Sequence, residues 1–224
     1  MSTELFDAID QQDLQQVATL LDQGADPNAL LDESPHWRPL GAAIEEIAWY
    51  DGSLDLVRVL IERGADVNAW DGENAGTPLH AALNILNADM TVENKEQVQR
   101  DLLRLLLDAG ANPNAVSDTG ESALRWAVEN GDLEMARLFL EFGASSTIDE
   151  FGGPCGETPL TLAARKLDVE MIELLIATGA DPHALDEDRR SPLEKLPPRE
   201  ESSPETWDRA VELLSTPRSH SEQP

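Results

Sequence analysis

Histidine and cysteine, the side chains that most often serve as bases, nucleophiles and metal ligands, are sparse in this sequence. The single cysteine is Cys155, which stands beside Gly153, Pro154 and Gly156, and the sequence identifies no base that would activate its thiol. The four histidines lie far apart and lack the spacing of metal ligands: His36, His80, His183 and His220. These residues therefore predict neither a nucleophile nor a metal site.

Other catalytic motifs are also missing from the sequence. It contains no Gly-x-Gly-x-x-Gly nucleotide loop, no Walker loop, no Gly-x-Ser-x-Gly elbow and no His-Glu-x-x-His zinc motif. The acidic run at residues 186–188 lacks the glycine and the distal glutamate of a calcium loop. Neighbouring acids such as Glu45 and Glu46 are better explained by a solvated acidic surface than by acid–base catalysis. We therefore expect no enzyme activity, no cofactor and no metal.

The balance of charge is the most unusual property of the composition. The 224 residues include 44 acidic and 16 basic side chains, which gives a net charge of -28. A field of this sign repels nucleic acid and anionic lipid and attracts basic proteins. Solubility or adaptation to high salt explains the same composition, so the sequence leaves both interpretations open.

Three features of the sequence favour the cytoplasm. A single cysteine allows no internal disulfide, which fits a reducing compartment. No apolar run approaches the roughly 18 residues that a membrane-spanning helix needs. The first residues carry acids in place of the basic and then apolar order of a signal peptide: Glu4, Asp7, Asp10 and Asp13. We expect a cytoplasmic monomer that contacts neither membrane nor nucleic acid.

The segment Gly76–Ala82, with the sequence Gly-Thr-Pro-Leu-His-Ala-Ala, predicts the elements that position the polar residues. Thr77 can cap a helix, and Pro78 is tolerated in its first turn because no amide hydrogen bond is lost there. The small and apolar residues that follow allow a neighbouring helix to pack closely. We interpret His80 as a structural side chain that bonds a turn.

A second pattern marks the ends of helices. Gly-Ala follows a helical run at five places: Gly24, Gly64, Gly110, Gly143 and Gly179. Glycine at this position adopts the left-handed conformation that ends a helix, and the Asp or Asn residues that follow four of the five start a turn. Related helix starts occur at residues 3–8, 38–43, 122–127, 158–163 and 191–193, the last shortened by Pro197-Pro198.

These motifs resemble the ankyrin-repeat family from about Thr3 to Leu214. The resemblance implies an all-α solenoid of five to six helix-pair repeats with short β-turn fingers and polar caps at both ends. We predict repeats at 3–36, 37–70, 71–116, 117–149 and 150–185, and a capping unit at 186–214 whose final helix has Ser203 as its N-cap. Residues 1–214 would form a single domain, followed by a disordered tail at 215–224.

The resemblance also implies binding on the concave side, where turn tips and the exposed edges of the first helices lie. The positions that map there are acidic or aromatic, and they form our predicted partner-binding set: Trp37, Glu45, Glu46, Trp49, Tyr50, Trp70, Asp71, Glu73, Asp118, Glu121, Glu129, Asn130, Phe151, Arg165 and Lys166. The exposed aromatics are either interface anchors or packed against the next turn. Trp126 maps to the core. The charged stripe of each second helix, such as Asp55, Arg58 and Glu62, is assigned to solvent.

The third repeat departs from the family pattern by an insertion at residues 84–100. We predict that its second helix starts about two turns earlier than usual, with Thr91 as its N-cap. The extra turns would rise beside the concave face and give a partner an additional surface to contact. A flexible loop is the alternative.

Three functions remain open on the sequence. The first is a non-catalytic module that binds a basic protein on an acidic face, as an inhibitor or immunity-type protein would. The second is a scaffold or regulatory subunit that recognises its partner through aromatic turn tips. The third is an enzyme or the regulatory part of one.

Overall fold

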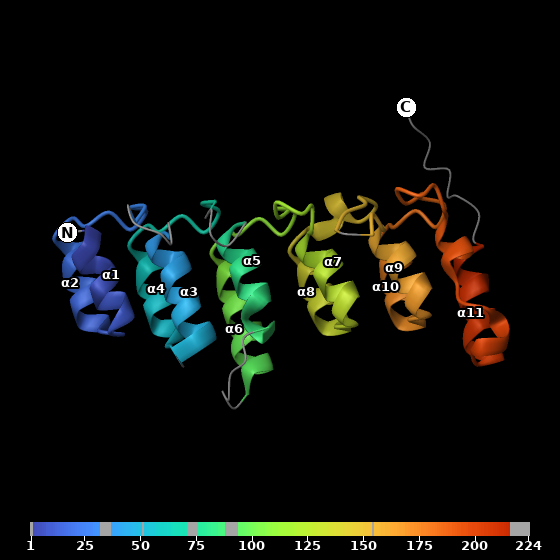
Figure 1. Cartoon of the computed structure of the whole chain (residues 1–224), viewed down its shortest axis with the longest axis horizontal. Helices are drawn as coiled ribbons and strands as arrows, with labels where there is room; N and C mark the ends of the chain where they lie inside the picture. The colour runs from blue at the N-terminus through green and yellow to red at the C-terminus, as the bar shows by residue number, and fades with distance from the viewer. Residues whose placement is uncertain are drawn as a thin grey trace. The chain divides into compact units, whose positions relative to one another are not determined.

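The computed structural model describes residues 2–31, 37–50, 52–70, 76–87, 94–153 and 155–215 (Figure 1). Within these ranges the ordered elements are helices and there is no β-strand, although Gly152 and Glu157 form an isolated bridge. The all-α prediction is therefore confirmed. Contacts divide the chain into two compact units, Met1–Asp118 and Thr119–Pro224.

In unit 1 the described residues form three helix pairs. They are α1 (Ser2–Asp10) with α2 (Leu14–Asp22), α3 (Pro39–Tyr50) with α4 (Leu54–Glu62), and α5 (Pro78–Leu83) with α6 (Lys95–Asp108), with the 3-10 helix η1 (Asn84–Asn87) following α5. The first helices pack on one another, α1 on α3 and α3 on α5, and the second helices α2 and α4 also touch. Each pair therefore covers the apolar side of the next, as the repeat pattern predicts.

Unit 2 repeats this arrangement within its own described residues. Its pairs are α7 (Ala123–Asn130) with α8 (Leu133–Glu141) and α9 (Pro159–Lys166) with α10 (Val169–Ala177), with the 3-10 helix η2 (Ala144–Thr147) between them. Helix α7 packs on α9, and α8 packs on α10. The 3-10 helices η3 (Pro192–Lys195) and η4 (Arg199–Glu201) lead to α11 (Pro204–Leu214), which packs on α10.

The helices begin and end where the sequence provides caps. Asp13, Asp132 and Asp168 each accept a backbone N–H from the third residue of the helix they precede, at 3.0, 3.0 and 3.1 Å. The five Gly-Ala glycines have φ between 92° and 110°, which confirms the predicted helix ends. A Cβ at any of the five would meet no atom within 4 Å, so the backbone conformation alone favours glycine there.

An asparagine in the turn after each of the first two second helices connects neighbouring repeats. Asn28 Nδ2 donates to the Gly64 carbonyl at 2.9 Å, and Asn28 Oδ1 accepts the Asp66 N–H at 2.7 Å. Asn68 makes the same two bonds one repeat later, to Gly110 and Asn112, at 3.0 and 2.7 Å. The Asp/Asn-x-Asn pattern is thus a connector between repeats as well as a turn signal.

The segment Gly76–Ala82 folds as its sequence predicts. His80 is 5% exposed, and its Nδ1 accepts the Thr77 N–H at 3.1 Å, so the imidazole closes the first turn of α5. Trp126 is buried at 8% exposure, which confirms its assignment to the core.

Helix α6 is longer than the other second helices, but by less than the two turns that the sequence predicts. The helix has 14 residues and the second helices α2, α4, α8 and α10 have 9 each. The difference is a little more than one turn. Asn94 has a φ of 68°, a left-handed conformation that separates α6 from the preceding residues. The proposed cap at Thr91 lies outside the described residues.

The C-terminal segment caps unit 2 in the predicted way. Helix α11 starts after Ser203, although the side chain of Ser203 makes no capping bond. Trp207 holds η4 against α11: its Nε1–H donates to the Pro197 carbonyl at 3.0 Å, and the Arg199 guanidinium lies 5.7 Å from its ring centre. Of the tail predicted to be disordered at residues 215–224, residues 216–224 lie outside the described residues.

Replacing the connector asparagine Asn68→Ala should lower the free energy of unfolding by about 1–2 kcal/mol, because two inter-repeat hydrogen bonds are lost. Urea titration followed by circular dichroism measures this. Gln15→Ala on the exposed side of α2 is the control and should change stability by less than about 0.5 kcal/mol. Equal effects of the two substitutions would contradict the connector role.

Candidate partner-binding face

Each first helix carries a buried leucine near its start, and the side chains one to two turns later define a repeated position. The leucines are Leu5, Leu40, Leu79, Leu124 and Leu160. We call the residue five places after the leucine the edge position: Asp10, Glu45, Asn84, Glu129 and Arg165. We call the residue after it the neighbour position: Gln11, Glu46, Ile85, Asn130 and Lys166. These ten residues, with the turn tips, form the candidate face of each unit.

The edge positions reach solvent and are mostly acidic. Four of the five are exposed, and Glu45 is half-buried. Three carry a carboxylate, one an amide and one, Arg165, a cation. A protein surface that touches these positions in unit 1 therefore meets negative charge, which favours basic groups opposite it.

Glu46 departs from the expectation of an exposed strip, because the side chain is only 7% exposed. Helix α1 packs against α3, and Asp10, the last residue of α1, acts on the Glu46 carboxyl through its charge. Burial raises the pKa of Glu46, and the nearby charge of Asp10 raises it further. Ile85, at the same position of the third repeat, is buried at 4% exposure.

The aromatic residues predicted at the face divide into exposed and covered ones. Trp49, Trp70 and Phe151 are 52%, 47% and 57% exposed, which is high for such large apolar side chains. The Trp49 indole N–H donates to Glu45 Oε2 at 2.7 Å, so this ring has a fixed orientation. Trp37 is half-buried with its ring nitrogen shielded from solvent, which favours the packing interpretation for that residue.

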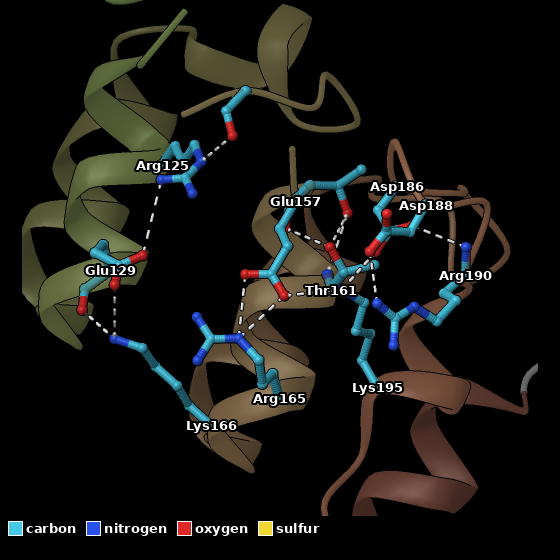
Figure 2. Close-up of polar contacts among 12 residues, drawn as sticks. Arg125, Glu129, Glu157, Thr161, Arg165, Lys166, Asp186, Asp188, Arg190 and Lys195 are labelled. Carbon is cyan, nitrogen blue, oxygen red and sulfur yellow. Dashed lines mark hydrogen bonds and ion pairs between the residues drawn. The ribbon is translucent and has the colours of Figure 1, made fainter. Parts of the chain in front are cut away.

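In unit 2 the acids of the face are already engaged by the chain's own cations (Figure 2). Arg125, whose side chain is 4% exposed, donates from Nε to the Gly152 carbonyl at 3.0 Å. Its Nη1 lies 3.5 Å from Glu121 Oε1 and 3.8 Å from Glu129 Oε2. Lys166 Nζ donates to the Glu129 carbonyl oxygen and lies 3.9 Å from Glu129 Oε1. Glu121 and Glu129 are therefore weaker attractors of a partner than their sequence suggests.

A buried ion network, also visible in Figure 2, surrounds Glu157. The Glu157 side chain is 2% exposed, and both its oxygens accept from Arg165 Nε, at 3.0 and 3.1 Å. Lys195 Nζ lies 3.1 Å from Glu157 Oε1 and 2.7 Å from Asp186 Oδ2. These contacts hold η3 against α9 and make Glu157 a structural residue.

The titration behaviour of this network follows from its ion pairs. Burial acts to raise the pKa values of Glu157 and Asp186, but hydrogen bonds outweigh it and lower both pKa values. Arg165 and Lys195 donate to Glu157, and Lys195 and the Arg190 N–H donate to Asp186. Burial likewise opposes the charge of Lys195, yet its two carboxylate partners raise the Lys195 pKa. Asp186 and Asp188 are thus engaged by Lys195 and Arg190, and no group of three or more metal-binding side chains occurs in the part of the chain described.

Two protein-family models match this sequence. A model of ankyrin repeats in three copies matches residues 89–186, and a model of ankyrin repeats in many copies matches residues 42–92. This chain belongs to the ankyrin-repeat family. Ankyrin repeats mediate protein–protein interaction, and the ankyrin fold is typically a non-catalytic module.

Individual ankyrin-repeat proteins are similar at moderate identity. A cation channel, transient receptor potential subfamily A member 1 of Homo sapiens, is 29% identical over 80% of this chain and 15% of its own length. The chain spans about 15% or less of the curated relatives it matches. An ankyrin repeat domain from Acinetobacter baumannii AYE has a TM-score of 0.69 and 24% identity, covering 94% of this chain and 95% of that one.

A second solved structure shares the ankyrin fold. It is a chain of the complex of a predatory endopeptidase from Bdellovibrio bacteriovorus with an immunity protein, with a TM-score of 0.65 and 24% identity. The match covers 94% of this chain and 98% of that chain. In the described part of the present chain, no helix is both long and apolar enough to cross a bilayer.

The predicted face residues differ in how far the structure exposes them. Asp118, Asn130, Arg165 and Lys166 are exposed as expected. Asp71, Glu73 and the side chain of Tyr50 lie outside the described residues. Asp10 was not among the predicted residues, although it lies five places after Leu5 and therefore occupies an edge position. Counting five residues from the buried leucine of each first helix would have assigned Asp10 to the face.

Replacing Lys195→Met should lower the free energy of unfolding by about 3–5 kcal/mol at pH 7, because Glu157 and Asp186 lose a shared buried cation. Both carboxyls have lowered pKa values, so the stability they contribute exists above about pH 4 and falls as pH drops through their folded-state pKa values. The cost of the substitution should therefore shrink as the pH falls below about 4.

The control is Arg190→Met, since the Arg190 pair with Asp188 is exposed on both sides and should cost far less than the buried Lys195 contacts. Denaturant titrations at several pH values measure both variants. A Lys195→Met cost that matched the Arg190→Met cost, or that grew on acidification, would contradict the network.

Proposed function

We propose that this chain is a non-catalytic binding module that holds a basic protein against the first-helix face, as an inhibitor or immunity-type protein does. The carrying observation is the pair of edge positions Asp10 and Glu45, which places carboxylates on the successive first helices α1 and α3 of unit 1. The net charge of -28 adds a long-range field of the same sign. Together they steer a basic partner toward the face and speed its association.

The exposed indole of Trp49 supports the same proposal. Large aromatic side chains at a protein surface are frequent anchors of interfaces. The ring is oriented by its bond to Glu45, so little side-chain entropy remains to be lost when a partner covers it. The occurrence of this fold in a complex of an endopeptidase with an immunity protein is compatible with an inhibitory role.

Location and assembly form part of the proposal. A cytoplasmic setting fits the single, exposed cysteine, which a reducing compartment keeps as a thiol. A monomer fits the large charge of one sign, since two copies would repel each other.

A scaffold that recognises its partner mainly through aromatic turn tips is the second candidate. Trp70 and Phe151 favour it, because both are about half exposed at turns. Phe151 stands beside Gly152, which is fixed by the Arg125 bond, so its backbone position is well defined.

The decisive experiment compares two double variants with the same net charge in capture of partners from the native host. Asp10→Asn with Glu45→Gln alters the face of unit 1, and Asp55→Asn with Glu62→Gln alters the exposed side of the second helix α4 in the same unit. The face variant should lose affinity for the captured basic protein by about tenfold, and the control by less than about twofold. Binding should also weaken from low to high salt.

Capture of only acidic or neutral proteins, or equal losses in the two double variants, would overturn the proposal. If Trp70→Ala with Phe151→Ala abolishes capture while the face variant keeps it, the scaffold function is favoured instead.

A further inference from the structure

The first two first helices of unit 1 carry acids and no cation. Neither α1 nor α3 contains a lysine or an arginine, and their acids are Glu4, Asp7, Asp10, Glu45 and Glu46. Helix α5, which packs on α3, also lacks both cations. In unit 2 the matching helices α7 and α9 supply cations of their own, and these pair with acids of the same unit. A positively charged partner is therefore attracted more strongly to the first helices of unit 1.

Trp49 lies on this acidic side of α3, one turn after the edge position Glu45. Residues four apart share a face of a helix, and the Trp49 indole N–H donates to Glu45 Oε2 at 2.7 Å. The N–H lies in the plane of the ring, so this bond holds the ring by its edge and covers neither of its faces. Because Trp49 is 52% exposed, a partner can reach a ring whose orientation is already fixed.

The bond to a carboxylate makes this ring a better site for a cation. The face of an indole is negative and attracts a cation that lies over it. A hydrogen bond from the ring N–H to an anion polarises the ring further, and the charge of Glu45 attracts the same cation. Among the residues that the structure describes, the only cation over an aromatic ring is Arg199 over Trp207, so none of them occupies the Trp49 ring.

The chain's own arginine shows how such a site is filled. The Arg199 guanidinium lies 5.7 Å from the centre of the Trp207 ring. Its Nε and Nη2 also donate to the two carboxylate oxygens of Asp208, at 3.0 and 2.8 Å. One guanidinium thus contacts an indole and a carboxylate at once, as its planar shape and forked donors allow. Trp49 and Glu45 present the same two groups to a partner.

We propose that Trp49 and Glu45 bind an arginine side chain of the protein partner, with the guanidinium over the indole ring and paired with the Glu45 carboxylate. A carboxylate accepts several hydrogen bonds, so the indole N–H and the guanidinium can share it. Arginine suits the site better than lysine, because a guanidinium is planar and more weakly hydrated than an ammonium group. This inference rests on the proposed function, because it names the side chain by which the basic partner is recognised.

The test compares two peptides of equal charge, hexa-arginine and hexa-lysine, by titration calorimetry at pH 7 and low salt. The wild-type chain should bind hexa-arginine more tightly. Trp49→Leu removes the ring and should weaken hexa-arginine binding by about threefold, with a smaller effect on hexa-lysine, so that the preference for arginine falls. The matched control is Trp70→Leu, which removes an equally exposed indole of the same unit and should leave the preference unchanged.

A second pair of variants tests the carboxylate. Glu45→Gln keeps a side-chain oxygen that can accept the indole N–H but removes the charge, so it should weaken hexa-arginine binding by about threefold or more. Glu62→Gln, on the exposed side of α4, changes the net charge equally and should have a smaller effect. Equal weakening by the two variants would contradict the site, because net charge alone would then govern binding.

An NMR measurement locates the contact directly. The indole N–H signal of Trp49, identified by its loss in Trp49→Phe, should shift when hexa-arginine is added, and the signal of the buried Trp126 should not. An unmoved Trp49 signal, or a preference for arginine that survives Trp49→Leu, would overturn the inference. Salt-sensitive binding of both peptides with equal affinity would also overturn it but leave the proposed function intact. If neither peptide binds, both fail.

Discussion

Close packing of successive first helices is the constraint on which the rest of each unit depends. An alanine lies three places after the buried leucine in every repeat: Ala8, Ala43, Ala82, Ala127 and Ala163. All five are buried, and four have no exposed surface. A side chain this small lets the neighbouring helix approach closely, and a larger one would force the pair apart or strain the backbone. The alanine therefore fixes the register between adjacent first helices.

That register decides which polar side chains meet. In unit 2 it brings the edge position of α7, Glu129, against the neighbour position of α9, Lys166. Whether such a contact stabilises the stack depends on the side chains that occupy the two positions. In unit 2 the pair is an acid and an amine, and the contact stabilises the stack. In unit 1 the acid Glu46 on α3 is buried where α1 packs on α3, and burial and the charge of Asp10 both raise its pKa.

Much of the fold could be predicted because its determinants are local. Aspartate caps, left-handed glycines and the Thr-Pro start each act within a few residues, so the sequence pattern and the structure agree. The start of α6 was predicted wrongly because Asn94 adopts a left-handed conformation that the apolar spacing of the segment does not indicate. A run of helix-compatible residues does not determine where the helix begins.

The candidate site was less predictable because it depends on contacts between repeats. The positions of the acids could be assigned from the sequence, but their ionisation and exposure could not. Glu46 is buried by helix α1, and Glu157 is buried under Lys195, a residue 38 positions away. Arg125 engages Glu121 and Glu129 from within the fold. Only the packing of one helix against another distinguishes an acid that attracts a partner from an acid that is already neutralised.

The most direct test of this account is a carbon-13 NMR titration of the Glu46 carboxyl in the unbound chain. The stacking register predicts that Glu46 titrates above the usual glutamate pKa, and that Asp10→Asn lowers that pKa because one of its causes is removed. An ordinary Glu46 titration that Asp10→Asn leaves unchanged would mean that α1 and α3 do not meet in this register, and the central claim would fail.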